Sequence, residues 1–434
     1  MSIRCRLACT VALGSLLVAS LPPAYGANDA KAVPKPDLAL IENVMQYVEN
    51  DYVHTVDAKQ LTSDALKGML TRLDPHSDYM TEQEYREMVK EMAGQFGGIG
   101  IRMSDTAGVP QVISPIDGTP AARAGLEPGD RIVAIDGHPT DGMDIERTIA
   151  LLRGRPGSKV TLRILRGSKP PFPVTITRAR IDVPTVTSKL EANGIGFVRI
   201  SEFDANTPPA VTAAVTNLNR LAGGHLHGLV LDLRNDPGGL LTAAVAVAGD
   251  FFDGGTVVTT HGRIGGDDET YSASGRGDLI PGTPMIVLIN SGSASAAEIV
   301  AGALQDRHRA TLMGTASFGK GSVQTIVPLG GDDGAVRLTT ALYYTPSGRS
   351  IQGNGIAPNI VVVVPKSEQV ANMVVLHESD LYGAFAHPTG AGAGTPPDYS
   401  PPIQPELIGT KQDDQLQAAL AYFDRTAARH QSGP

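Results

Sequence analysis

Two side chains of this sequence, those of Ser295 and Lys320, have the surroundings that best suit covalent chemistry. Ser295 follows the apolar run Met285 to Asn290 and a Ser-Gly-Ser turn, and it stands at the start of a predicted helix from Ala294 to Asp306. Unpaired N–H groups and the positive end of the helix dipole favour a developing negative charge at such a position. The position therefore suits the nucleophile of an acyl transfer.

A serine hydroxyl is a weak nucleophile at neutral pH and needs a base within hydrogen-bond distance. Lys320 lies in the glycine-rich turn Gly314 to Gly321, which follows a second predicted strand, Ala310 to Met313. Because burial lowers the pKa of a lysine, a buried amine can be neutral and accept the serine proton. The order strand, turn, helix, strand, lysine loop can therefore bring a hydroxyl and an amine together.

Each of these residues also has a purely structural explanation. Ser295 to Glu298 reads S-A-A-E, which is a capping box, and a lysine between glycines is more often solvated or anion-binding. His308, which follows the predicted helix, is a second candidate base and keeps a Ser–His mechanism open. It stands near the end of that helix, where cationic residues commonly lie.

Three stretches, GSASAAEI, FGKGSVQ and DLRNDPGG, resemble the carboxyl-terminal processing peptidases, the S41-type Ser–Lys proteases. The resemblance implies a multidomain α/β chain with an N-terminal helical segment, a PDZ-like β-rich domain and a ClpP/crotonase-like α/β serine protease core. It also implies that Ser295 is the nucleophile, Lys320 its base and Gln324 a supporting residue. The chain has Ala297 where the family commonly has a second serine, and Ser291 where it often has an acidic residue. Neither change touches the reacting groups.

A second loop, Arg234 to Gly239, follows the predicted buried strand Gly228 to Leu233. Strands and helices alternate here, which favours an α/β domain with a largely parallel sheet, and sites gather at the carboxyl ends of such strands. Paired glycines let backbone N–H groups approach a substrate carbonyl. The resemblance implies an oxyanion hole made by Gly238 or Gly239 with the N–H of Ala296; an ordinary strand-to-helix turn is the alternative.

Short β-rich runs separated by glycine and proline extend from Phe96 to Arg180. The stretch PAARAGLEPGDRIVAIDG, Pro120 to Gly137, resembles PDZ domains, and a helix from Met143 to Arg153 and a strand from Lys159 to Leu165 are expected after it. In PDZ domains a peptide adds as a strand to a sheet edge, and loop N–H groups hold its terminal carboxylate. The resemblance assigns this loop to Gly97, Gly98, Ile99, Gly100 and Ile101.

The segment 1–26 has the pattern of a secretory signal peptide. Arg4 and Arg6 precede the apolar run Leu7 to Leu21, which is shorter than the about 20 apolar residues of a membrane span. We therefore expect a secreted, periplasmic protein with no stable membrane span after cleavage. The two cysteines of the chain, Cys5 and Cys9, lie in this segment, so the mature chain has no thiol chemistry and no disulfide.

Without the segment 1–26, the chain is longer than one hydrophobic core normally supports, so several domains are expected. We predict a signal peptide at 1–26, a helical segment at 27–92, a PDZ domain at 93–180, a peptidase core at 181–365, and a C-terminal linker and helix at 366–434. Removing two arginines with the signal takes the formal charge from −9 to −11, which disfavours nucleic-acid binding. The ten histidines lack metal-ligand spacing, so we expect no metal and no cofactor.

Two further segments have simpler predicted roles. Asp74 and His76, in LDPHSDYM, are expected to form a capped turn rather than a metal or acid–base site. The linker Pro388 to Pro405 and the amphipathic helix Asp413 to Ala428 are interpreted as a tail that could dock on a partner or a second protomer, and the sequence assigns it no role.

The sequence predicts a serine endopeptidase that cleaves proteins near their carboxyl end, with substrates that carry a free C-terminus. A further expectation is that the chain forms a homo-oligomer or binds an adaptor protein. The alternative is a catalytically silent PDZ adaptor on a protease-like scaffold.

Overall fold

The computed structural model describes residues 35–93, 96–106, 109–116, 118–143, 145–167, 169–181, 184–263, 268–370, 375–388 and 401–431. The predicted signal peptide and most of the predicted linker lie outside these ranges. Within them, no helix combines the length and the apolar composition that crossing a membrane requires.

The chain divides into two compact units, residues 1–64 and 65–434. Helix α1 spans Lys35–Asp51 in the first unit, and the boundary falls within α2, Ala58–Leu70, which begins where Asp57 accepts the N–H groups of Lys59 and Gln60 at 2.8 and 3.0 Å. The helical spacing of α1 is confirmed. Its apolar side chains are nevertheless largely exposed: Leu40 64%, Ile41 52%, Val44 52% and Tyr47 70%.

A turn and a third helix follow α2 in the second unit. Asp74 Oδ1 accepts the N–H groups of His76 and Ser77 at 2.8 and 2.9 Å, so the predicted capped turn is confirmed. The next residues form β1, Asp78–Met80. Helix α3, Glu82–Met92, then starts at a capping box in which Glu84 accepts the N–H of Thr81 at 2.7 Å.

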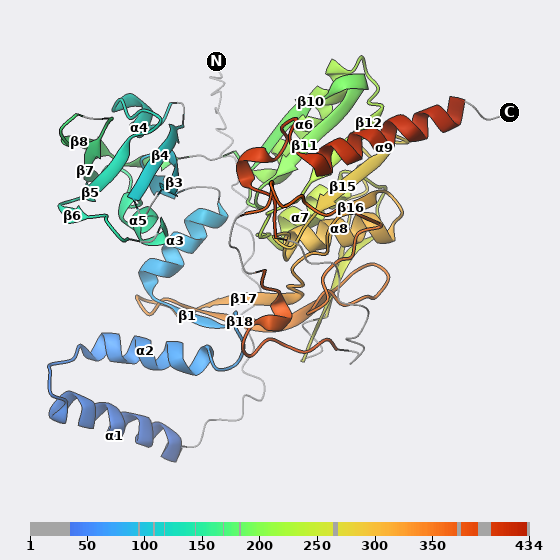
Figure 1. The fold of residues 1–434 in the computed structure, drawn as a ribbon. Coiled ribbons are helices and arrows are strands. Elements are labelled where there is room, and N and C mark those ends of the chain that lie inside the picture. Colours follow the sequence, from blue (N-terminus) through green and yellow to red (C-terminus); the bar gives the residue numbers. More distant parts are fainter. Residues whose placement is uncertain are drawn as a thin grey trace, which may run out of the picture. The chain divides into compact units, whose positions relative to one another are not determined.

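An antiparallel sheet with strand order β3-β4-β5-β7-β8, and β6 beside β5, forms the β-rich domain (Figure 1). Val160, Leu162 and Ile164 alternate along β7 and are fully buried, as a strand with one face on a core requires. Strands β2 (Phe96–Gly98) and β9 (Ala179–Ile181) pair and bring the ends of the domain together. The other elements are β3 Ile101–Thr106, β4 Val109–Pro115, α4 Pro120–Arg123, β5 Arg131–Ile135, β6 His138–Pro139, α5 Ile145–Leu152, β7 Lys159–Leu165 and β8 Phe172–Thr177.

A second sheet has the order β10-β11-β12-β15-β16-β19, with only β10 antiparallel to its neighbour, so the predicted largely parallel α/β sheet is confirmed. Every residue of β12 and β15 is buried, because helices cover both faces of a parallel sheet. Its strands are β10 Val186–Leu190, β11 Ile195–Ile200, β12 Gly228–Asp232, β15 Met285–Ile289, β16 Thr311–Gly314 and β19 Ile360–Val361.

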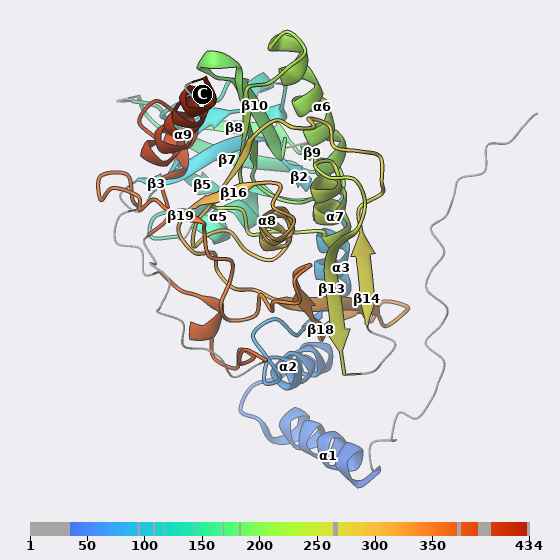
Figure 2. The same cartoon turned by 90° about the vertical axis from the view of Figure 1, so that its right-hand side faces the viewer.

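Three helices, α6 (Thr207–Leu221), α7 (Leu241–Gly249) and α8 (Ala296–Asp306), pack on one face of this sheet. The C-terminal helix α9, Asp414–Gln431, lies on the other face, as the red helix in Figure 2 shows. Its Leu416, Ala419 and Phe423 are buried against Phe197 and Val230. The prediction that this helix docks on a partner is therefore wrong for its apolar face, which the sheet of the same chain covers.

A third sheet, ordered β1-β18-β13-β14 with β17 on β18, joins parts of the chain that are distant in sequence. Residues 78–80 of β1 pair with residues 335–337 of β18. The strands are β13 Thr256–Gly262, β14 Glu269–Ser272, β17 Ser322–Pro328 and β18 Ala335–Tyr344, and the short 3₁₀ turns are η1 Ala192–Gly194, η2 Glu378–Asp380 and η3 Pro405–Leu407.

Candidate active site

Three loops meet at one edge of the parallel sheet, because β12, β15 and β16 are neighbours and each loop follows the carboxyl end of its strand. The loops are residues 233–240, 290–295 and 315–321. The N–H of Ala294 donates to the carbonyl of Asp236 at 2.9 Å, and the N–H of Phe318 donates to the carbonyl of Ser293 at 2.9 Å. The serine turn is thus bonded to both other loops.

Ser295 has an uncommon backbone conformation, with φ 53° and ψ −112°. Such a conformation is costly for a residue other than glycine and is found most often at functional sites. Gly238 packs directly against it: a Cβ at Gly238 would lie 2.9 Å from Ser295 Cβ and 2.8 Å from the nitrogen of Ala296. Only glycine fits here, and its missing Cβ leaves the N–H of Ala296 uncovered on this side.

The carboxylate of Glu298 ties the serine turn to the lysine loop. Its Oε2 accepts the N–H of Ser295 at 2.8 Å and the N–H of Lys320 at 2.9 Å. Its Oε1 accepts the Ser317 hydroxyl at 2.5 Å and the N–H of Gly319 at 2.7 Å. Because one oxygen atom accepts both N–H groups, the backbones of Ser295 and Lys320 are held close together.

The same carboxylate is fully buried. Burial raises the pKa of Glu298 to about 7, and the hydrogen bonds that it accepts work against that rise. The predicted capping box is present, since Glu298 accepts the N–H of Ser295. The glutamate also holds the lysine loop, which a capping box alone does not require.

Lys320 is partly buried in the loop between β16 and β17. Burial lowers the pKa of its amine, and the carboxylates of Glu378, Glu298 and Asp74 oppose that effect. The net shift is downward, which is the direction that a lysine base needs.

The glycine loop after β12 is held by backbone hydrogen bonds to Phe203 and by the side chain of Asp236. The N–H of Phe203 donates to the carbonyl of Gly238 at 2.8 Å, and the N–H of Leu240 donates to the carbonyl of Phe203 at 2.7 Å. The N–H of Gly238 donates to Asp236 Oδ1 at 2.8 Å. Burial raises the pKa of Asp236 well above its ordinary value.

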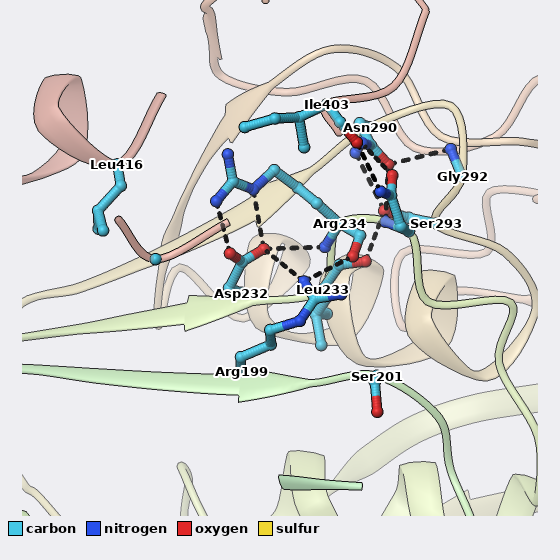
Figure 3. A network of polar contacts seen from close by, with 12 residues as sticks. Arg199, Ser201, Asp232, Leu233, Arg234, Asn290, Gly292, Ser293, Ile403 and Leu416 are labelled. Carbon is cyan, nitrogen blue, oxygen red and sulfur yellow. Dashed lines mark hydrogen bonds and ion pairs between the residues drawn. The ribbon is translucent and has the colours of Figure 1, made fainter. Parts of the chain in front are cut away.

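Arg234, in the same loop, is fully buried between two carboxylates. It donates to Asp232 at 2.6 and 2.9 Å, and to Asp413, at the start of the C-terminal helix, at 2.6 and 2.8 Å. Figure 3 shows the bonds between Asp232 and Arg234, with Asn290 and Ser293 of the serine turn nearby. Although burial alone would raise the pKa of the Asp413 carboxyl, its bonds to Arg234 hold the pKa below its ordinary value.

This ion pair leads to a prediction about stability. Asp413→Ala is expected to lower the free energy of unfolding by about 3–5 kcal/mol, because it leaves the buried guanidinium with one carboxylate fewer. Asp424→Ala, an exposed position on the same helix, is the matched control and is expected to change it by no more than about 0.5 kcal/mol. Denaturant unfolding of both variants measures the difference, and equal stability of the two would contradict the role given to Asp413.

The remaining candidate residues lie as follows. Gln324 is on β17, and its amide donates to Ser322 at 2.9 Å and to Thr339 at 3.3 Å; among the described residues it has no hydrogen bond to Lys320.

His308 follows the carboxyl end of α8, whereas Ser295 precedes its amino end. The 11 residues of that helix separate the two positions by about 16 Å.

Of the residues predicted to form the carboxylate loop, Gly97 and Gly98 lie in β2 and pair with β9, Ile99 and Gly100 form the connection, and Ile101 begins the edge strand β3. Gly100 has φ +78°, and its carbonyl accepts the Thr119 hydroxyl at 2.9 Å and the N–H of Ile116 at 3.0 Å. The carbonyl of Ile99 accepts the N–H of Ala121 at 2.8 Å. These bonds fix the shape of the loop.

Three buried charged residues around these loops, Arg234, Glu378 and Asp413, have no pattern in the sequence that marks a role at the site. Arg234 is one residue of the motif DLRNDPGG, and Asp413 is the first residue of the predicted final helix. The S-A-A-E spacing did mark Glu298, although its bond to the lysine loop depends on the fold.

Comparison with known proteins gives three family matches. Peptidase family S41 matches residues 194–362, the PDZ domain matches residues 111–166, and the N-terminal domain described as that of the activating protease CtpB matches residues 22–84.

Curated relatives match over most of the chain. The carboxy-terminal-processing protease of Bartonella bacilliformis is 46% identical over 80% of this chain and 80% of its own length. The carboxy-terminal processing protease CtpA of Bacillus subtilis is 34% identical over 75% of this chain and 69% of its own length. Among solved structures, a photosystem II D1 C-terminal processing protease is 30% identical, with a TM-score of 0.46 over 76% of this chain and 94% of its own. The chain belongs to the carboxy-terminal processing proteases, serine peptidases of family S41 that here carry a PDZ domain.

Proposed function

We propose that this protein cleaves proteins near their carboxyl end with Ser295 as nucleophile and Lys320 as general base. The observation that carries the proposal is the shared carboxylate of Glu298, whose Oε2 accepts the N–H groups of both residues at 2.8 and 2.9 Å. With their backbones fixed this close together, a serine hydroxyl and a lysine amine can come within hydrogen-bond distance.

Peptide hydrolysis by this dyad needs four proton transfers to or from Lys320 Nζ. Neutral Lys320 Nζ takes the Ser295 proton as Oγ attacks the scissile carbonyl carbon, and it returns that proton to the amine nitrogen as the C–N bond breaks. Water next gives a proton to Nζ as its oxygen attacks the acyl ester. The ester C–O bond breaks as Nζ returns this proton to Ser295 Oγ, and the acid product releases the second water proton to solvent and leaves with a new carboxylate.

Two backbone N–H groups would stabilise the negative oxygen of each tetrahedral intermediate. Ala296 N–H is next to Ser295 at the amino end of α8, where the helix dipole favours negative charge. Of the two glycines, Gly239 is the better donor, because the N–H of Gly238 already donates to Asp236 at 2.8 Å. We therefore propose Gly239 and Ala296 as the oxyanion hole, with Gly238 providing room for the substrate.

Gln324 is proposed to support Lys320. Its amide bonds to Ser322 and Thr339 link β17, which follows the lysine loop, to β18. Truncation of Gln324 would therefore loosen the lysine loop rather than remove a reacting group.

Two alternatives have less support. A Ser–His mechanism through His308 is disfavoured because α8 separates His308 from Ser295 by about 16 Å. A catalytically silent adaptor is disfavoured because the chain keeps a serine, a lysine and a glycine pair in adjoining loops, and because it belongs to a peptidase family.

We propose that the PDZ domain recognises the terminal carboxylate of the substrate at Gly97 to Ile101. β3 is an edge strand of its sheet, so a peptide can add beside it as a further strand. When empty, the domain is proposed to restrain cutting, and the docked tail shifts the population toward an open form because it binds that form more tightly.

The test compares a peptide that has a free carboxyl terminus with its amidated twin. The wild-type enzyme is expected to cleave the free-acid peptide at least about tenfold faster at low substrate concentration. Gly100→Ala is expected to remove this preference, because the new Cβ would lie 2.4 Å from Thr119 Cβ. Gly125→Ala is the control: Gly125 also has a positive φ, +74°, but open space around it. Equal cleavage of the twins by the wild-type enzyme would refute recognition of the carboxylate.

The proposed site of action is the periplasm, on the basis of the signal-like segment 1–26. Fractionation of producing cells tests this, since the mature protein should begin near Ala27 and be found in the periplasmic fraction. A cytoplasmic chain that still carries the segment 1–26 would contradict it.

A further inference from the structure

A second buried carboxylate, Glu378 in η2, holds the lysine loop in addition to Glu298. Glu378 is fully buried, and its N–H donates to the carbonyl of Phe318 at 3.1 Å. Its Oε1 accepts the side-chain N–H of Gln352 at 3.0 Å, and the side-chain oxygen Oε1 of Gln352 accepts the N–H of Gly321 at 3.0 Å. The chain on both sides of Lys320 is therefore attached to Glu378, directly or through one side chain.

His76 fixes the carboxylate of Glu378. His76 Nε2 lies 2.9 and 3.0 Å from the two carboxylate oxygens, although the residues are 302 positions apart in sequence. His76 is itself held in the turn capped by Asp74, and its carbonyl accepts Arg337 Nε at 3.0 Å. The negative charge of Glu378 thus has a fixed place in the core.

Among the described residues, the charges of three carboxylates and one guanidinium influence the pKa of the Lys320 amine. Glu378, Glu298 and Asp74 favour the ammonium form, whereas Arg337 disfavours it. Burial is the largest influence and lowers the pKa of Lys320, and Glu378 is the strongest of the charges that oppose this effect. Removal of one carboxylate or of the guanidinium should therefore move the titration of the amine in opposite directions.

We propose that Glu378 is a positioning residue for catalysis: held by His76, it fixes the Lys320 loop and keeps a negative charge facing the amine. The proposal rests on the Ser295–Lys320 dyad. It extends the active site to η2 and to the turn before β1, which contribute no reacting atom.

The pH dependence of kcat/KM tests this role, because the acid limb of the profile reports the titration of the free base. Glu378→Gln keeps the shape of the side chain and an oxygen for Gln352, but removes the charge. Its acid limb is expected to move down by roughly 0.5–1 pH unit. Arg337→Gln removes the cation and is expected to move the limb up by a similar amount.

The opposite directions of these two shifts distinguish an effect of charge from a loss of structure. Glu378 and Arg337 both contact His76, so structural damage to this network would move the acid limb in the same direction in both variants. Glu378→Asp retains the charge, so its limb is expected within about 0.3 pH unit of the wild-type value even if its rate falls. A limb that moves in the same direction in Glu378→Gln and Arg337→Gln, or that moves in neither, would overturn the proposal. If Glu378→Gln does not fold, a limb of Glu378→Asp that moves by about one pH unit or more still contradicts it.

Failure of the dyad itself is distinguishable from failure of this proposal. If Lys320 is not the base, Lys320→Ala retains the acid limb and the activity, whatever Glu378→Gln does. If the dyad is correct and Glu378 is merely structural, Lys320→Ala is inactive and the limb of Glu378→Gln stays in place.

Discussion

Replacement of Ser295 by alanine is expected to lower kcat/KM for peptide hydrolysis on the order of 10⁴–10⁶-fold. The substitution removes the oxygen that forms the acyl ester. Its effect on stability is expected to be small, because loss of a helix-capping side chain costs about 1 kcal/mol. Kinetics and thermal unfolding of the same preparation measure both effects.

A useful control is Ser347→Ala, which removes a hydroxyl in an exposed turn outside the three loops. This variant is expected to retain full activity. Activity of Ser295→Ala within tenfold of the control would show that Ser295 is only a helix cap.

Replacement of Lys320 is expected to have a similarly large effect. Lys320→Ala removes the proton acceptor, and Lys320→Arg does not restore it, because a guanidinium stays protonated and cannot accept the serine proton. Both variants are expected to lose on the order of 10³-fold or more in kcat/KM. His308→Ala is expected to stay within about twofold of the wild type, since His308 follows the opposite end of α8.

The same variants separate the two possible bases. In the wild type, the rate is expected to rise with pH through the lowered pKa of Lys320, at a value below the ordinary lysine range near ~10.4. A histidine base would give a rising limb near ~6.5 that disappears in His308→Ala. An active Lys320→Ala together with an inactive His308→Ala would establish the Ser–His mechanism instead.

Local patterns in the sequence were enough to predict the sheet that carries the site. β15 is a short, continuous apolar run and β12 is apolar up to its last residue, Asp232; such runs indicate buried parallel strands. Glycines in all three loops, with a proline in the loop after β12, marked where the strands end. Helix α8 begins at Ala296 rather than at the predicted Ala294, because Ser295 has a non-helical backbone with φ 53°.

Contacts between distant segments could not be predicted in this way. The pairs Arg234 with Asp413 and His76 with Glu378 join residues 179 and 302 positions apart, and no periodicity of a single chain marks such partners. The same reason explains the error about the C-terminal helix. An amphipathic pattern shows that one face of α9 needs apolar contact, but it does not show which surface supplies that contact.

The position of β19 at the edge of its sheet explains why this strand is shorter than the sequence predicts. The predicted strand Ile360 to Val364 is only Ile360–Val361, because it pairs with just Met313 and Gly314 at the edge of the sheet. Val363 is 45% exposed. An apolar run predicts burial on both faces, which an edge strand does not have.

The most direct test of the central claim reads new carboxyl termini by mass spectrometry in the secreted proteins of cells that produce either the wild-type enzyme or Ser295→Ala. If Ser295 and Lys320 act as proposed, a set of proteins shortened near their carboxyl ends should appear with the wild type and be absent with Ser295→Ala and with Lys320→Ala. The same shortened proteins in cells that produce Ser295→Ala would contradict the assignment of the nucleophile and, with it, the proposed mechanism.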